Sequence, residues 1–161
     1  MRKRIMIIGN SRIGKTSLAN CINSEDFEVM KSQAISYGEN TIDTPGEYLE
    51  SPMMHKYIIS ASQDADAVLF VQSFDQPIFS FPPNFAQVFN TKRIGVITKN
   101  DLEDKRHDLG LLLNNFREIG LEEPFFITSS KTKEGIKELK NYLLGKQKTD
   151  EQTGCLTKKN G

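Results

Sequence analysis

The stretch Gly9-Asn10-Ser11-Arg12-Ile13-Gly14-Lys15-Thr16 fits the phosphate-binding pattern G-x-x-x-x-G-K-[ST] at every fixed position. The apolar run Ile5-Met6-Ile7-Ile8 precedes it and predicts a buried strand, and residues 17–23 behind it predict a helix. The alternative is a strand, a turn and a helix whose glycines and lysine carry no function. The context of the motif favours a loop that binds the phosphates of a nucleotide.

Each residue type in this loop has a chemical role in such a site. The glycines let the backbone approach a polyphosphate, and backbone N–H groups then form an anion nest at the positive end of the following helix. We expect the Lys15 ammonium to reach the β- and γ-phosphates and the Thr16 hydroxyl to ligate Mg²⁺. The residues predicted to bind the phosphates are Gly9, Asn10, Ser11, Arg12, Ile13, Gly14, Lys15, Thr16 and Ser17.

The composition indicates one soluble globular domain. Lys+Arg and Asp+Glu number 21 each, so the chain has no basic field that would hold nucleic acid. The apolar run near the start is too short for a signal-peptide core or a membrane span. Cys21 and Cys155 lack metal-ligand spacing and fit a reduced, cytoplasmic setting. We predict a nucleotide-binding domain at residues 1–144 and a polar, disordered tail at residues 145–161.

Strands and helices alternate along the chain. Apolar runs predict buried strands at residues 67–71, 93–97 and 124–127, and weaker patterns predict strands at residues 33–37 and 41–43. Helical patterns occupy residues 52–62, 84–90, 105–119 and 134–144. This order predicts an α/β fold with a mostly parallel sheet between two layers of helices. Ligands of such sheets bind beyond the carboxyl ends of the strands.

The segment Asp43-Thr44-Pro45-Gly46 follows one of the predicted strands. A carboxylate at Asp43 would hold a water molecule on the Mg²⁺, and the Gly46 N–H would contact a γ-phosphate. The alternative is an ordinary turn sequence. The preceding phosphate loop favours the metal-binding interpretation.

The segment Thr98-Lys99-Asn100-Asp101 follows another buried strand. The Asp101 carboxylate can accept hydrogen bonds from both N1–H and the 2-amino group of guanine, a pair that adenine lacks. The Lys99 stem can lie over the purine ring. The alternative for Asp101 is a helix cap. Ser129-Ser130-Lys131 follows the last strand, and its backbone would meet O6 of the base, although it is also an ordinary loop sequence.

In this order the motifs resemble those of the translation-factor-related small GTPases: a phosphate loop, D-x-x-G, [NT]-K-x-D and S-A-K. The resemblance covers residues 3–144 and implies a P-loop NTPase fold of the small G-domain type, a three-layer sandwich. It also implies Mg²⁺ and GTP or GDP as ligands, with ATP or ADP as the alternative. Thr98 stands at a position where many such proteins have asparagine.

The chain also resembles the EutP/PduV proteins of ethanolamine and propanediol utilisation. The residues that carry this resemblance are Lys31-Ser32-Gln33-Ala34-Ile35, Ile42-Asp43-Thr44-Pro45-Gly46-Glu47-Tyr48 and Ile119-Gly120-Leu121-Glu122-Glu123-Pro124. That family implies a cytoplasmic protein associated with a bacterial microcompartment, with shell proteins as its partners. Some of its members are described as acetate kinases, which implies ATP as the nucleotide.

Two charged residues depart from the GTPase pattern. Arg12 stands at the fourth position of the phosphate loop, where its guanidinium would neutralise charge at the β–γ bridge. Glu47 follows Gly46, where many GTPases place a glutamine that orients water. Lys15, Arg12 and Glu47 are therefore the candidate catalytic residues. The alternative is that Arg12 points to solvent and Glu47 caps the following helix.

Three functions are compatible with these residues. The first is a guanine-nucleotide-binding regulator with slow hydrolysis, which Asp101 favours. The second is a small phosphotransferase that passes a γ-phosphoryl group to acetate, which the family resemblance favours. The third is a nucleotide-dependent targeting or scaffolding subunit without turnover, which Asp101 also favours.

Overall fold

A parallel sheet forms the centre of the protein in this computed structural model, which describes residues 3–10, 13–30, 52–75, 81–102 and 109–145. In that part of the chain the sheet has five strands in the order β2-β1-β4-β5-β6. The strands are β1 (Lys3–Ile8), β2 (Phe27–Met30), β4 (Ala67–Ser73), β5 (Lys92–Thr98) and β6 (Phe125–Ile127). Parallel pairing brings the carboxyl ends of these strands to one edge of the sheet.

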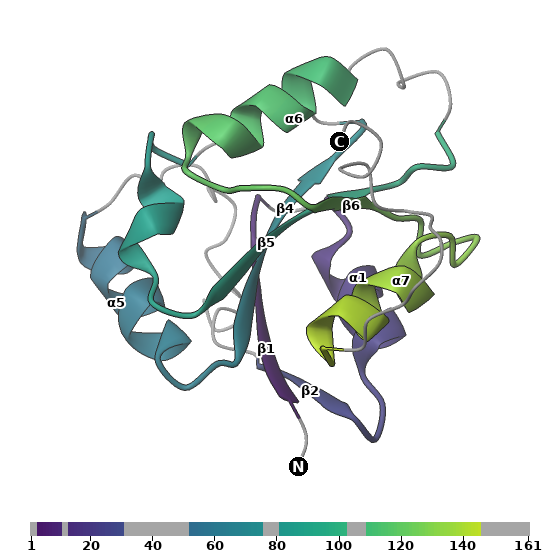
Figure 1. The fold of residues 1–161 in the computed structure, drawn as a ribbon, viewed down its shortest axis with the longest axis horizontal. Helices are drawn as coiled ribbons and strands as arrows, with labels where there is room; N and C mark the ends of the chain where they lie inside the picture. The colour runs from purple at the N-terminus through teal and green to yellow at the C-terminus, as the bar shows by residue number, and fades with distance from the viewer. Residues whose placement is uncertain (1–2, 11–12, 31–51, 76–80, 103–108, 146–161) are drawn as a thin grey trace.

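Helices cover both faces of the sheet (Figure 1). On one face lie α1 (Lys15–Ile22) and α7 (Ile136–Leu143). On the other lie α5 (Pro52–Ser62), the short 3₁₀ helix η1 (Phe85–Val88) and α6 (Leu109–Glu118). The predicted α/β fold with three layers is therefore confirmed.

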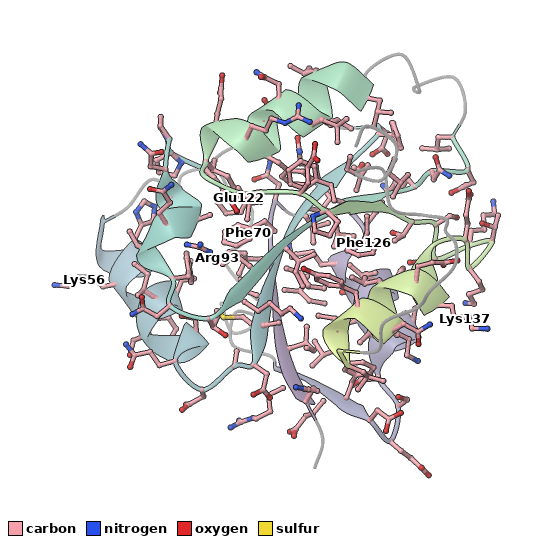
Figure 2. The ribbon with its side chains drawn as sticks, in the orientation of Figure 1. Lys56, Phe70, Arg93, Glu122, Phe126 and Lys137 are labelled. Carbon is pink, nitrogen blue, oxygen red and sulfur yellow. The ribbon has the colours of Figure 1, made fainter. Side chains whose placement is uncertain are left out.

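Strands β1, β4, β5 and β6 each serve two hydrophobic cores because their side chains alternate between the faces. In β1, Ile5 and Ile7 pack into the core under α1 and α7, whereas Met6 and Ile8 pack into the core under α5 and α6. Figure 2 shows the same division in two aromatic residues, since Phe70 lies on the α5 side and Phe126 on the α7 side. Burying a side chain of this size contributes about 1.5–3 kcal/mol. The two cores together hold the carboxyl edge of the sheet in place.

A glycine in β5 allows α6 to pack closely against the sheet. Gly95 lies in the middle of β5, where a Cβ atom would be 2.8 Å from Cδ2 of Phe116. Phe116 itself is fully buried. The absent side chain of Gly95 therefore makes room for the ring on which α6 packs.

The element boundaries agree with the sequence in part. The helix predicted at residues 52–62 is α5, but the helix predicted at residues 17–23 begins two residues earlier, so that Lys15 and Thr16 lie in its first turn. The segment predicted as a helix at residues 84–90 is a 3₁₀ helix of four residues, and α7 begins at Ile136 because Gly135, with φ 77°, breaks the helical path before it.

Strand β2 was not predicted, since Phe27–Met30 alternates too briefly to give a clear pattern. The predicted strands at residues 33–37 and 41–43, the start of the helix at 105–119 and the tail from residue 146 lie outside the described residues. Among the helices that the structure describes, none is long and apolar enough to cross a bilayer.

Candidate functional site

The phosphate loop connects β1 to α1 at the carboxyl edge of the sheet. Gly9 fits because a Cβ atom there would lie 2.6 Å from Cδ1 of Ile13 and 2.8 Å from the carbonyl oxygen of Val71. Gly14 adopts the left-handed conformation, with φ 92°, at the N-cap of α1. Both glycines are thus required by the backbone path. The neighbouring Ser11 and Arg12 lie outside the described residues.

The Lys15 side chain folds back over its own loop. Its Nζ donates hydrogen bonds to the carbonyl oxygens of Gly9, at 2.8 Å, and Asn10, at 2.7 Å. Burial lowers the pKa of Lys15 from 10.5 to about 8. The two hydrogen bonds therefore hold the ammonium beside the loop. The oxygens of a polyphosphate would replace these two carbonyl oxygens as its partners.

The first turn of α1 suits an anion with a bound cation. The N-cap residue Gly14 has no side chain, so no side-chain hydrogen bond caps the first N–H groups of the helix. Thr16 and Ser17 are exposed in this turn. A hydroxyl oxygen together with phosphate oxygens is a donor set that fits Mg²⁺. The second predicted metal residue, Asp43, lies outside the described residues. Within the described residues, no three acidic, histidine or cysteine side chains form a group that could hold a metal ion.

Thr98 ties the end of β5 to the phosphate loop. Its buried hydroxyl donates to the carbonyl oxygen of Ile13 at 2.6 Å, and the carbonyl of Gln72 lies 3.3 Å from the same oxygen. Sequence reasoning treated Thr98 only as a tolerated motif variant. The structure gives it a positioning role. The signal that could have revealed this role is a hydroxyl residue where a strand ends beside the loop.

Asp101 and Ser129, predicted from separate motifs, lie in contact. The Ser129 hydroxyl donates to Oδ1 of Asp101 at 2.8 Å, across 28 residues of sequence. Ser129 is fully buried and Asp101 is half-buried. The serine therefore orients a carboxylate at the carboxyl edge of β5 and β6.

The loop after β6 is held by Glu134, which sequence reasoning missed. The Asn100 amide donates to Oε1 of Glu134 at 2.6 Å, and the backbone N–H of Ser129 donates to the Glu134 carbonyl at 3.0 Å. Within this loop Ser130 is half-buried, whereas Lys131 is exposed. Glu134 thus links the Thr98–Asp101 segment to the Ser129–Lys131 segment, a pairing that no local sequence pattern reports.

Lys99 pairs with a residue that the sequence did not single out. Its Nζ lies 3.0 Å from Oδ2 of Asp75, which follows β4. The hydroxyl of Ser73 donates to the other carboxylate oxygen of Asp75. Burial alone would raise the pKa of Asp75, but the hydrogen bonds from Ser73 and Lys99 and the Lys99 charge outweigh it and lower that pKa.

The described residues thus bring two sets of predicted site residues to one edge of the sheet. The set predicted to bind phosphates comprises Gly9, Asn10, Ile13, Gly14, Lys15, Thr16 and Ser17. The set predicted to bind the base comprises Lys99, Asp101, Ser129, Ser130 and Lys131. Thr98 connects the two sets through its hydrogen bond to the Ile13 carbonyl oxygen. The remaining predicted residues Ser11, Arg12, Asp43, Gly46 and Glu47 lie outside the described residues.

The chain is similar to the PduV and EutP proteins over almost its whole length. Residues 2–145 match the family model PduV-EutP, described as ethanolamine utilisation and propanediol utilisation. The propanediol utilization protein PduV of Citrobacter freundii is 36% identical, and the alignment covers 97% of this chain and 99% of that protein. The probable acetate kinase EutP of Escherichia coli K12 is 32% identical, covering 92% of this chain and 94% of that one.

Among solved structures, the FeoB G-domain of Methanococcus jannaschii superposes with a TM-score of 0.55. The match covers 89% of this chain and 97% of that chain, at 19% sequence identity. Identity at this level shows a shared fold. The three-layer architecture is therefore that of a P-loop GTPase domain.

Proposed function

This chain belongs to the PduV-EutP family of ethanolamine and propanediol utilisation, and from that premise we propose that it binds a guanine nucleotide with Mg²⁺. The phosphates would lie on the loop before α1, and the base would lie against the ends of β5 and β6. The protein would then act as a regulator of ethanolamine or propanediol utilisation, and its activity would depend on whether GTP or GDP is bound.

The observation that carries the choice of base is the contact between Asp101 and Ser129. Guanine presents N1–H and a 2-amino group side by side, and an oriented carboxylate can accept from both. Adenine has no donor pair on that edge. A charge-assisted pair of this kind in a half-buried site contributes more than a neutral hydrogen bond. The Ser129 hydroxyl supports the choice because it fixes the carboxylate before the base arrives.

The phosphate end of the site supports binding of a nucleotide of either base. Lys15 supplies the cation, and the uncapped first turn of α1 supplies backbone donors. Thr16, with Asp43 in the proposed second role, would hold Mg²⁺, which lowers the charge on the phosphates.

Competition binding on the full-length protein tests the proposal. GDP and ADP are titrated against a fluorescent nucleotide in the presence of Mg²⁺, with Lys15→Ala as the variant and Lys56→Ala as its matched control. Lys56 is exposed on α5 and points away from the body of the protein (Figure 2). We expect tight GDP binding by the parent and by Lys56→Ala. Tight ADP binding with no GDP binding would overturn the choice of base.

A second candidate function is phosphoryl transfer between ATP and acetate, which the name of the Escherichia coli relative favours. In that reaction an acetate oxygen attacks the γ-phosphorus, the bond to the β–γ bridging oxygen breaks, and ADP leaves. Arg12 would stabilise the charge that develops on the bridging oxygen. Glu47 would repel the phosphate unless a cation neutralised it, and Arg12 is the proposed cation.

Single-turnover transfer to water and to acetate distinguishes the two functions. The parent is compared with Arg12→Ala and Glu47→Gln. If Arg12→Ala slows transfer to both acceptors while Glu47→Gln speeds hydrolysis alone, the protein is a phosphotransferase. Parental rates in both variants would remove these two residues from the chemistry.

Tight nucleotide binding with no turnover would instead favour a targeting or scaffolding subunit. In that case the partner would be a shell protein of a microcompartment, and the protein would work in the cytoplasm beside it. Co-sedimentation with purified shells in GDP and in a non-hydrolysable GTP analogue tests this proposal.

A further inference from the structure

The ion pair between Lys99 and Asp75 fixes both side chains at the carboxyl edge of the sheet. The Nζ–Oδ2 distance is 3.0 Å, and each side chain is about a third exposed, at 30% and 31%. The second carboxylate oxygen accepts from the Ser73 hydroxyl, and the Asp75 N–H lies 3.2 Å from the same hydroxyl. Asp75 is therefore held from two sides and presents one oxygen to Lys99.

The path of the Lys99 side chain crosses the phosphate loop. Lys99 has a left-handed backbone, with φ 65°, directly after β5. Its Cε lies 3.9 Å from the position that a Cβ of Gly14 would occupy. The aliphatic stem thus runs from the end of β5 past Gly14, and its ammonium ends at Asp75 beyond β4. Asp101 stands two residues after Lys99 and contacts Ser129.

We propose that Asp75 is a positioning residue for the nucleotide base, because it holds the Lys99 stem in place as the platform on which the purine lies. This inference rests on the proposed function and adds a residue to it. A lysine stem is a suitable surface for a flat ring because its methylene groups are apolar while its head stays paired. Without the Asp75 carboxylate the ammonium would lose the partner that holds it beyond β4, and the charge of the phosphates would draw it and the stem toward them.

The direction in which nucleotide affinity changes when Asp75 loses its charge distinguishes a positioning role from simple charge repulsion. The lowered pKa of Asp75 keeps its carboxylate ionised at neutral pH. A negative charge near a polyphosphate weakens binding of the anion, so its removal alone would tighten binding. The positioning role predicts the opposite result for Asp75→Asn, which keeps the shape of the side chain and removes the charge.

The experiment compares a ligand that has a base with one that lacks it. The dissociation constants for GDP and for inorganic tripolyphosphate are measured for the full-length parent, Asp75→Asn and Asp64→Asn. Asp64 is an exposed aspartate that precedes β4 at the opposite edge, so it controls for loss of one surface charge. We expect Asp75→Asn to weaken GDP by about threefold to tenfold, as for a partly exposed ion pair, and to leave tripolyphosphate within about twofold of the parent.

A double-mutant cycle identifies Lys99 as the residue through which Asp75 acts. Lys99→Met keeps a stem of similar length and removes the charge. We expect Asp75→Asn to cause no further loss of GDP affinity in the Lys99→Met background. Asp75→Glu, which keeps the charge, should recover part of the affinity that Asp75→Asn loses. Circular dichroism and thermal melting of each variant separate loss of affinity from loss of fold.

The outcomes distinguish this inference from the proposed function. A parent protein that binds neither GDP nor ADP would overturn both. If the parent binds GDP but Asp75→Asn behaves like Asp64→Asn, binds GDP more tightly, or loses GDP and tripolyphosphate equally, the role of Asp75 is overturned alone. An additive cycle with Lys99→Met would likewise remove Lys99 as its point of action.

Discussion

Thr98 and Ile13 are joined by a hydrogen bond of 2.6 Å between the threonine hydroxyl and the isoleucine carbonyl, across 85 residues of sequence. Both residues are almost completely buried. The bond fixes the phosphate loop relative to the strand that carries Lys99 and Asp101. It therefore sets the distance between the groups that would bind phosphate and the groups that would bind a base.

Thr98→Val should loosen this connection while preserving the shape of the side chain. The Ile13 carbonyl would lose a buried donor, which costs about 1–3 kcal/mol of unfolding free energy. Denaturant unfolding measures that cost, and GDP titration measures the accompanying loss of affinity. Thr98→Ser is the matched control because it keeps the hydroxyl. Equal stability and affinity in the two variants would show that the bond does not hold the loop.

Gly95→Ala tests the packing of α6 on the sheet. The added methyl group would meet the Phe116 ring at 2.8–3.0 Å, so the ring or the helix must move. Overpacking of this kind costs about 1–3 kcal/mol. Gly110→Ala in α6 is the control, since no atom of the described residues outside the backbone of α6 lies within 4 Å of its Cβ position and alanine favours a helix by up to about 1 kcal/mol. Opposite shifts in the melting temperature are expected, and parallel shifts would contradict this packing.

The sequence predicted those elements whose signal is local. Continuous apolar runs predicted the buried strands β4 and β5. The phosphate-loop pattern predicted the turn between β1 and α1, because its glycines and lysine lie within a few residues of one another. The proximity of Asp101 and Ser129 could also be predicted, since motifs at strand ends converge at one edge of a parallel sheet.

Contacts that depend on strand register could not be predicted in the same way. Asp75 meets Lys99 because β4 and β5 pair with Ser73 opposite Thr98, and nothing near residue 75 indicates that pairing. Strand β2 forms because its four residues pair with Lys3–Met6, although its own pattern is weak. The first turn of α1 includes Lys15 because Gly14 can adopt a left-handed conformation there.

Lys15→Ala should abolish nucleotide binding and leave the fold intact, because it removes the Lys15 ammonium from the phosphate loop.

The pH dependence of nucleotide binding by the parent gives a second test of the role of Lys15. In the folded, free protein the pKa of Lys15 is lowered to about 8 by burial, and phosphates would raise it again in the complex. Binding then takes up a proton, so affinity should be highest below about pH 8 and fall as the pH rises above it.

The stability of the nucleotide-free protein should change in the opposite direction. Between about pH 8 and 10.5 the unfolded chain keeps a proton on Lys15 that the folded chain has lost. The unfolding free energy contributed by Lys15 therefore rises across this window. Chemical unfolding of the parent and of Lys15→Met at several pH values isolates this contribution. An identical pH dependence of the unfolding free energy in both proteins would show that the pKa of Lys15 is not lowered by folding.

Asp101→Asn should change which base the protein prefers. The asparagine loses the charge that accepts from guanine N1–H and the 2-amino group, so GDP should bind more weakly by about 1–3 kcal/mol. Xanthine nucleotide should gain affinity because its 2-oxo group can accept from the new amide. The Ser129 hydroxyl can still donate to the amide oxygen, so the loop after β6 should keep its conformation. Titration of GDP and XDP against the variant measures the exchange, with Asp64→Asn as the control for charge. If the ratio of the two affinities is unchanged, Asp101 caps a helix and does not read the base.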